Sequence, residues 1–228
     1  MGRGHLPIGR RERAKRDKRE RIMTAARELF AEHGVSGVTT QQIADRADIA
    51  IGTLYHYAST KAELLIMVQN EKFAAAIDEG FAAANAVDGQ GALDAVVALT
   101  GPVVACLREQ IENGGMYLHE LVFGDPAEPY RRAGLALAAR LEDRIASLLT
   151  RDDYGYDDID AADAATLARV ITAIIHISTT ATVYLHRSDE AVLADIRDQI
   201  HASLAPCRRR SASEHRTHAS WNIPDSRT

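Results

Sequence analysis

The sequence predicts an all-α protein of about nine helices. Ala-rich stretches occur throughout, only 6 of the 228 residues are proline, and 46% of the residues are hydrophobic. Apolar residues recur at three- and four-residue steps along most of the chain, which is the period of an amphipathic helix. The charged fraction of 26% is typical of a soluble globular protein, and the length allows one large domain or two small ones.

Residues that favour helix ends bound the predicted helices. Gly34 ends the first helix, as a glycine just past a C-terminus does, and Thr40 is a suitable N-cap for the second. Residues 48–49 form a tight turn, and Thr60 begins the fourth helix with Glu63 three positions later, as in a capping box. The expected helices are 22–33, 41–47, 50–57, 61–84, 92–113 (bent at Pro102), 116–123, 129–149, 161–187 and 189–204.

Composition divides the chain into four regions. Residues 1–10 contain three glycines and one proline and are expected to form a flexible arm. Residues 206–228 are rich in Arg, Ser, His and Thr with few apolar residues, which predicts a disordered tail. Residues 11–60 and 61–205 lie between them as two helical domains.

Charge is distributed unevenly along the chain. Residues 1–61 contain 12 Lys and Arg against 7 Asp and Glu, a formal charge of +5, whereas the rest contains 15 against 25, a charge of −10. A basic front on an acidic body indicates that one end of the protein meets a polyanion. The alternative is a solvated basic tail with no partner.

No membrane, secretory or disulfide signal is evident. Cys106 and Cys207 lie about a hundred positions apart, without the spacing of a disulfide framework or a zinc finger. No apolar stretch follows the basic N-terminus, so no signal peptide is expected. The most apolar segment, 170–185, is judged too short and too polar to span a bilayer. We expect a cytoplasmic protein that does not contact a membrane.

No group of residues predicts catalysis, a metal site or a cofactor. The acidic run at 152–160 does not match the calcium-loop pattern, and it is interpreted as a solvated loop. Cys207, His215 and His218 could attract a metal, but they lie in the predicted tail. The sequence has no nucleophile elbow, phosphate-binding glycine loop or zinc-helix motif. An enzyme is therefore not expected.

The N-terminal region contains the parts of a helix-turn-helix unit. Two short helices joined by a tight turn follow a longer helix, and their apolar residues can meet in a small core. In such a unit the second short helix enters the major groove of DNA and the first lies across the backbone. The residues left free on the outer surfaces are Gln41, Gln42, Ile51, Thr53, Tyr55 and His56.

Residues 19–66 resemble the N-terminal domain of the TetR family of bacterial repressors, with the family spacing intact. The resemblance lies in the run from Ile22 to Phe30, then Gly34, Val38-Thr39-Thr40, Ile43-Ala44, Ala47, the run from Gly52 to Tyr57, and Lys61-Ala62-Glu63-Leu64. The remaining two-thirds of the chain resembles the family only in length and helix pattern. The resemblance implies a homodimer whose two recognition helices face one side of double-stranded DNA.

The resemblance also implies the DNA contacts. Thr40 is expected to cap the second helix and bind a phosphate, and Gln41 to reach a phosphate or pair with adenine. Tyr55, His56 and Tyr57 match backbone-contacting positions, and Lys61 matches a phosphate-binding lysine. The candidate DNA-binding residues are Thr40, Gln41, Ile51, Gly52, Thr53, Tyr55, His56, Tyr57 and Lys61.

Four positions depart from the family pattern. Asp48 replaces the turn glycine, but Asp tolerates the left-handed conformation better than most residues. Ala50 replaces a Ser-like residue and leaves the recognition helix without a side-chain cap. Ile51 either touches a thymine methyl group or is a partly exposed packing residue. Ala58 replaces a Phe, so looser packing is expected under the third helix.

Eight basic residues between Arg10 and Arg21 precede the first predicted helix. One interpretation is a flexible arm that follows the phosphate backbone or enters the minor groove. The alternative is a solubilising tail. The adjacent helix-turn-helix favours the first.

The two last helices carry apolar stripes. Leu167, Val170, Ile171, Ile174, Ile177 and Ala181 form one, and Leu193, Ile196, Ile200 and Leu204 form the other. The resemblance implies a four-helix bundle with the partner subunit, because both helices are too apolar for a free surface. The alternative is a pair of core helices within one subunit.

The resemblance places an effector pocket among the middle helices. A mostly apolar cavity with a few polar groups suits a small hydrophobic or amphipathic molecule. His176 is the polar residue that differs from its aliphatic neighbours, and it is either a ligand contact or a satisfied core or interface histidine. The candidate ligand-binding residues are Val103, Leu107, Met116, Tyr117, Glu120, Phe123, Tyr130, Ile171, Ile175, His176 and Thr179.

Together these features predict a transcriptional regulator of two parts, a three-helix DNA-binding domain and a helical ligand-binding and dimerisation domain. It is expected to bind a palindromic operator as a repressor and to be released by the effector. A regulator without a small-molecule effector and an activator are the alternatives.

Overall fold

The structure, a computed structural model, describes residues 9–87, 89–151 and 159–205. Within these residues the chain forms nine α-helices and a short 3-10 helix, and no strand. The prediction of an all-α fold of about nine helices is confirmed. The predicted tail 206–228, residues 1–8 of the predicted arm and residues 152–158 of the acidic run lie outside the described residues.

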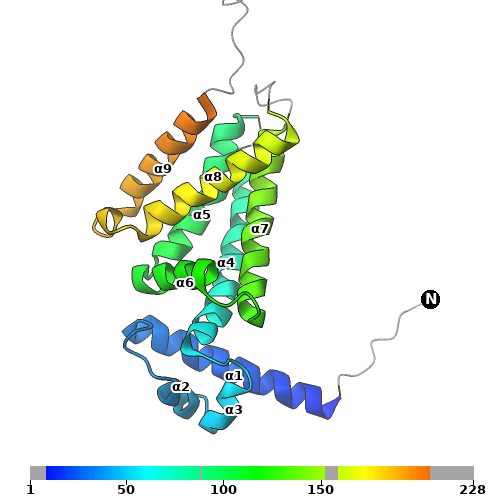
Figure 1. Ribbon diagram of the computed structural model, residues 1–228, viewed down its shortest axis with the longest axis vertical. Helices are drawn as coiled ribbons and strands as arrows, with labels where there is room; N and C mark the ends of the chain where they lie inside the picture. Colours follow the sequence, from blue (N-terminus) through cyan, green and yellow to red (C-terminus); the bar gives the residue numbers. More distant parts are fainter. Residues whose placement is uncertain (1–8, 88, 152–158, 206–228) are drawn as a thin grey trace, which may run out of the picture.

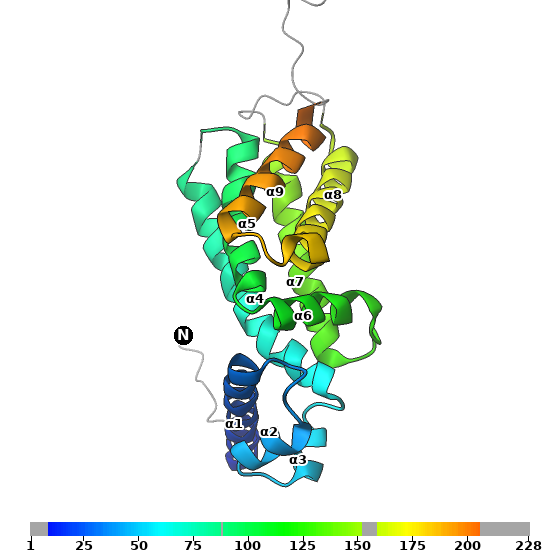
Figure 2. The ribbon, with the colours of Figure 1, turned by 90° about the vertical axis from the view of Figure 1, so that its left-hand side faces the viewer.

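The helices form two groups that follow each other along the long axis of the molecule (Figure 1). The small group contains α1 to α3, the larger bundle contains α5 to α9, and α4 runs from one into the other. Helix α6 lies across the end of the bundle that meets the small group (Figure 2). The bounds are α1 Arg10–His33, α2 Thr40–Arg46, α3 Ile51–Tyr55, α4 Lys61–Ala86, α5 Ala92–Arg108, α6 Ile111–Phe123, α7 Pro129–Leu149, α8 Ala161–Thr180 and α9 Asp189–Leu204.

Helix α1 begins at Arg10, twelve residues before its predicted start. The interpretation of residues 10–21 as a flexible arm was therefore wrong. Opposite charges stand four residues apart in this segment, as at Glu12 and Arg16 or Arg13 and Asp17, and such pairs stabilise a helix that has no apolar face. The helix ends as predicted, because Gly34 has a φ of 69° and donates its backbone N–H to Phe30.

The short helices of the small group begin and turn through local hydrogen bonds. Thr39, and not Thr40, caps α2: its side chain accepts from the N–H of Gln42, whose side chain accepts from the N–H of Thr39. The turn into α3 passes through Asp48 with a φ of 51°, as predicted for the residue replacing a glycine. Ala50 precedes α3 without a side-chain cap, also as predicted.

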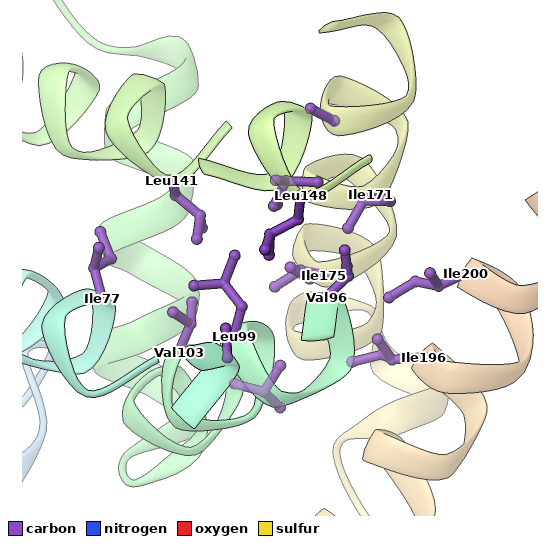
Figure 3. Packing of buried hydrophobic residues seen from close by; sticks show 14 of the residues in the cluster. Ile77, Val96, Leu99, Val103, Leu141, Leu148, Ile171, Ile175, Ile196 and Ile200 are labelled. Atoms are coloured by element: carbon purple, nitrogen blue, oxygen red, sulfur yellow. The ribbon is translucent and has the colours of Figure 1, made fainter. Parts of the chain in front are cut away.

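Two hydrophobic cores correspond to the two groups of helices. The small core joins α1, α2, α3 and the first turns of α4, and Ile22, Ile43 and Leu54 are completely buried in it. The large core joins α4 to α9 (Figure 3), with Leu99 and Ile196 at its interior. Because α4 contributes to both cores, its orientation fixes one group relative to the other.

The region between α5 and α6 differs from the prediction. The expected helix 92–113 ends at Arg108, and Gly114 and Gly115, predicted as a loop, lie inside α6. The reason is a close approach of backbones, since a Cβ on Gly114 would collide with the carbonyl oxygen of Leu107. A glycine pair inside a helix is tolerated where a neighbouring chain passes this near.

Helix α8 ends at Thr180, where the prediction extended it to Arg187. A 3-10 helix, Thr182–Tyr184, follows it. With 20 residues and a mean hydropathy of 1.3, α8 is long and apolar enough to cross a membrane by length and composition alone, and 28% of its most apolar window is buried. This differs from the sequence-based judgement of segment 170–185. In the structure α8 packs Ala164, Ala168 and Ile171 into the large core.

A buried arginine fixes the connection between α8 and α9. Arg108, at the end of α5, is 6% exposed. Its guanidinium donates to the carboxylate of Asp189 at 2.6 Å and to the backbone carbonyls of Tyr184 and Arg187. The connection is therefore held against α5 by one side chain that satisfies three acceptors.

Alanine substitutions at the two adjacent glycines of α6 are expected to change the stability of the fold in opposite directions. Gly114→Ala is expected to destabilise the fold by about 1–3 kcal/mol, because the added methyl group forces α6 away from α5. Gly115→Ala has open space around the added atom and is expected to raise stability by about 0.5–1 kcal/mol through helix propensity. Thermal unfolding of the two variants measures both; equal effects would contradict the close contact.

Candidate functional site

Helix α3, which was predicted to be the recognition helix, presents a polar surface opposite its buried side. Leu54 is completely buried and holds α3 on the small core. Tyr55 is 48% exposed, and Gly52 and His56 are also exposed. Thr53 is half-buried. The five-residue helix therefore turns Leu54 inward and leaves its polar residues on the outer surface.

Helix α2 places its first residues beside α3. The hydroxyl groups of Thr40 and Tyr55 are 3.2 Å apart and share a hydrogen bond. The exposed amide of Gln41 donates to Asp45 at 2.7 Å. The predicted residues of α2 and α3 are thus brought together on one surface, as the sequence analysis expected.

Three other predicted residues make contacts within the protein. Ile51 is half-buried and packs against the small core, which supports its interpretation as a packing residue. Tyr57 donates its hydroxyl to the backbone carbonyl of Lys15 at 3.2 Å. Lys61 donates to the carbonyl of Val38 at 3.0 Å, so this predicted phosphate ligand also holds the connector between α1 and α2.

Comparison with known proteins identifies this part of the chain. Residues 22–68 match the sequence model of the family described as "Bacterial regulatory proteins, tetR family". The N-terminal domain is a TetR-family DNA-binding domain. The matched family consists of transcriptional regulators and not of enzymes.

One similar curated protein is the HTH-type transcriptional repressor KstR of Mycobacterium tuberculosis. It is 38% identical over 60 residues, which are 26% of this chain and 27% of KstR. The match thus spans about a quarter of that relative and lies within one domain.

Solved structures extend the likeness in fold to the body. The regulator FadR from Bacillus subtilis has a TM-score of 0.60 and 18% identity over 81% of this chain and 98% of its own. A TetR transcriptional regulator from Rhodococcus sp. RHA1 has a TM-score of 0.57 and 19% identity over 85% of this chain and 98% of its own. The TetR-family domain therefore stands on a body with the same fold as these regulators.

The first turn of α6 is hydrogen-bonded to the end of α1. Asn113, 4% exposed, donates to the carbonyl of Phe30 at 2.9 Å and accepts from the N–H of Val35 at 2.8 Å. Glu112 accepts from the N–H of Ser36 at 2.8 Å, and Gln110 donates to the carbonyl of Ala31. We call the three side chains Gln110, Glu112 and Asn113 the α6 latch. Their role was not predicted from the sequence, because their partners lie about eighty residues away along the chain.

A second junction joins the start of α7 to the end of α6 and to the loop between them. Arg131 is 2% exposed and donates to the carbonyls of Glu120 and Asp125 and to the carboxylates of Glu120 and Glu128. Glu63 is 1% exposed, and its Oε1 atom has no hydrogen-bond partner. The predicted capping box at Thr60 is thus formed on one side only: the Thr60 hydroxyl accepts from the N–H of Glu63.

An apolar pocket of about 300 Å³ lies between α6, α7 and α8. Of the predicted ligand-binding residues, only Ile175 and His176 line it. Partial burial and the nearby His119 lower the pKa of His176 below its ordinary value. The other lining residues are Leu118, Leu121, Val122, Leu135, Ala138, Leu141, Glu142, Arg169, Thr172 and Ala173.

The structure distributes the remaining predicted pocket residues elsewhere. Val103, Leu107 and Ile171 are buried in the large core, as Figure 3 shows for Val103 and Ile171. Tyr117 is also buried there, and its hydroxyl donates to Asn70 at 2.9 Å. The residues that do not line the pocket are Val103, Leu107, Met116 (38% exposed), Tyr117, Glu120, Phe123 (72% exposed), Tyr130, Ile171 and Thr179.

The predicted apolar stripes of α8 and α9 are split between core and surface. Ile196, Ile200 and Leu204 of α9 are buried within the subunit, as the alternative of an intramolecular core pair proposed. On α8, by contrast, Val170 is 41% and Ile177 58% exposed. In Figure 1 α8 crosses the bundle obliquely and meets α9 at the connection between the two helices.

The buried carboxylate of Glu63 predicts a pH-dependent stability. Burial first, and then the charge of Glu128, raise the pKa of Glu63 above its ordinary value of 4.5, against backbone hydrogen bonds from Arg131 and Tyr130. Its ionised form therefore opposes folding at pH values above 4.5. Glu63→Gln is expected to raise Tm at about pH 7, and this gain is expected to shrink as the pH falls toward 4.5.

Glu112 supplies a control of opposite sign. Hydrogen bonds from Ser36 lower the pKa of Glu112, so its charge supports the fold above pH 4.5. Glu112→Gln is expected to lower Tm at about pH 7, with the loss disappearing in acid below the ordinary pKa. Melting curves between about pH 2 and pH 8 test both variants; a Glu63→Gln gain that did not depend on pH would contradict the account.

Proposed function

We propose that this chain is a repressor that binds a palindromic operator as a homodimer and is released by a hydrophobic or amphipathic small molecule. One observation supports this most strongly: α6 both lines an apolar pocket and hydrogen-bonds to the TetR-family DNA-binding domain. A change at the pocket thereby has a direct route to the recognition helix. The name of the similar protein KstR, a transcriptional repressor, supports the sign of the regulation.

The proposed release begins at α6. Leu118, Leu121 and Val122 of α6 form one wall of the pocket, so a bound molecule pushes against this helix. The α6 latch then displaces the end of α1, because Asn113 holds both a carbonyl and an N–H of the connecting backbone. In a dimer, such a shift changes the spacing of the two recognition helices from the roughly 34 Å that successive major grooves require.

The proposed dimer forms through α8. Val170 and Ile177 expose an apolar surface along this helix, and Val183 just after it is 76% exposed. A second copy related by a two-fold axis covers such a surface with its own. The same apolar surface explains why α8 has the composition of a membrane-spanning helix and why only 28% of its most apolar window is buried within the subunit.

The effector class follows from the pocket walls. The lining is mostly aliphatic, with Glu142, Arg169, Thr172 and His176 as its polar groups. Such a pocket suits an apolar body with one polar end. FadR from Bacillus subtilis was solved in complex with stearoyl-CoA, which is a molecule of this amphipathic kind. A regulator without an effector would have no use for a pocket that touches α6.

Operator binding is tested by selecting duplexes from a random-sequence library with the purified protein. The selected DNA is expected to contain an inverted repeat. Thr53→Val replaces the hydroxyl group by a methyl group of similar size, and it is expected to reduce the affinity roughly tenfold, the effect of one hydrogen bond to a charged or polar group. Fluorescence anisotropy measures this loss, and an unchanged Tm excludes misfolding. Equal affinities would remove Thr53 from the DNA interface.

Effector release is tested by filling the pocket. Ala138→Trp on α7 adds a ring where the lining residues leave space. The variant is expected to bind the selected operator like the wild type but to stay bound when short-, medium- and long-chain acyl-CoAs are added. Ala139→Trp, at the exposed neighbouring position, is the matched control and is expected to release as the wild type does. Wild-type protein that no amphipathic molecule releases would favour an effector-free regulator.

A further inference from the structure

In its second half, α1 packs an apolar side against the small core. In its first half, the same side of the helix carries cations. Ile22, Ala25 and Leu29 are buried on the side of α1 that faces the small core. Counting back from Ile22 by alternating steps of four and three residues gives Lys18, Lys15 and Arg11. Because these steps keep residues on one side of a helix, the same side that is apolar over α2 becomes cationic beyond it. We call Arg11, Lys15 and Lys18 the basic stripe.

The acidic residues in the first half of α1 lie on other sides of the helix than the basic stripe. A helix turns about 100° per residue, which places Glu12, Asp17 and Glu20 at least about a quarter-turn from the centre of the stripe. The stripe is therefore a face of one charge and not a mixed surface of alternating charge. Charged residues that served only solubility would not need to be separated by sign onto different sides of the helix.

The cations of the basic stripe also differ from those nearer the core in having no acidic partner. Arg21 pairs with Asp48, Arg27 with Glu71 and Arg46 with Glu28. In the part of the chain that the structure describes, neither Arg11 nor the two lysines of the stripe form an ion pair, and all three are exposed. Their charge is available to an external anion.

The extension is fixed beside the recognition helix. The hydroxyl of Tyr57, two residues after α3, donates to the carbonyl of Lys15, and the guanidinium of Arg19 lies over the ring of Tyr130 at 5.8 Å. In Figure 1 the N-terminal half of α1 continues past α3 at the same end of the molecule. The basic stripe thus begins where the proposed DNA-contacting surface ends.

We infer that the basic stripe binds the phosphate backbone of DNA immediately outside the half-site contacted by α3. Arg11 and Lys18 are seven residues apart, about 10 Å along the helix axis, which matches the axial length of about three nucleotides of one strand. Phosphate contacts of this kind add affinity without reading sequence. The inference rests on the proposed DNA-binding function and assigns a second, sequence-independent contact to each subunit.

The test compares a minimal operator duplex with the same operator extended by about ten base pairs on each side, one turn of DNA. The stripe variant is Arg11→Gln with Lys15→Gln and Lys18→Gln. The control variant is Arg10→Gln with Arg13→Gln and Arg16→Gln, which removes the same charge from the other sides of the helix. The control removes Arg13 and Arg16, which stand four residues from the opposite charges of Asp17 and Glu12, so it weakens the helix at least as much.

On the extended duplex the stripe variant is expected to bind at least about tenfold more weakly than the wild type at about 0.1 M salt. The slope of log affinity against log salt is expected to become shallower by about 5 for the dimer, since each subunit loses three phosphate contacts and each contact contributes about 0.9. On the minimal duplex the stripe variant is expected to match the wild type. The control variant is expected to stay near the wild type on both duplexes.

Two results would overturn the inference. Equal losses for the stripe and control variants on the extended duplex would mean that only net charge matters. No loss for the stripe variant would mean that DNA does not reach this face. If wild-type protein bound neither duplex, the proposed function itself would fail and the inference with it, which differs from a protein that binds DNA but ignores the stripe.

Discussion

The side-chain amide of Asn113 is the contact on which the relation between the two parts of the molecule depends. It satisfies a carbonyl and an N–H of the chain around Gly34, both shielded from water. Removing it would leave the buried N–H of Val35 unpaired, at a cost of about 1–3 kcal/mol, and the carbonyl of Phe30 would keep only the N–H of Gly34 as a partner. Apolar packing between α6 and α1 could slide by a fraction of an ångström, whereas a pair of opposed hydrogen bonds permits little displacement. The body and the DNA-binding domain therefore move together.

This junction also explains the position of two glycines. Gly34 ends α1 in the left-handed conformation, and the carboxylate of Glu112 occupies the space where a Cβ would lie. Gly114 lets α6 approach the last turn of α5. Both residues permit α6 to reach α1. Gly34 turns the chain away at the end of α1, and Gly114 has no side chain to collide with α5. Their role is geometric, and they place the latch between the pocket and the recognition helix.

Local signals in the sequence predicted the DNA-binding domain well. Gly34 and Asp48 stand where the backbone adopts conformations that few other residues tolerate, which identified the two turns. The short apolar faces of α2 and α3 can be buried together in one arrangement, around Leu54. The start of α1 escaped prediction because its stabilising pattern is one of charge and not of hydrophobicity. The cap at Thr39 was misplaced by one residue, since Thr39 and Thr40 are equally able to cap and only the position of Gln42 decides.

The pocket was predicted poorly for a different reason. Apolar periodicity identifies which side of a helix is buried but not whether it meets the core or a cavity. Val103 and Tyr117 have the composition of pocket residues and are core residues. The latch and Arg131 were invisible to this approach, because a polar side chain becomes a junction only through a partner far away in the sequence. Tertiary contacts, and not local pattern, determined both.

The uneven charge of the chain gives the proposed DNA complex its orientation. The body carries most of the acidic residues, so DNA phosphates repel it, while the basic front attracts them. At low salt this difference acts over about 10 Å or more and turns the small group of helices toward the duplex before any specific contact forms. The cations nearest the core are neutralised by acidic partners. The attraction is therefore concentrated on the exposed basic residues in the first half of α1. In the proposed complex, contact starts at the edge of the predicted recognition surface, and α3 then enters the groove.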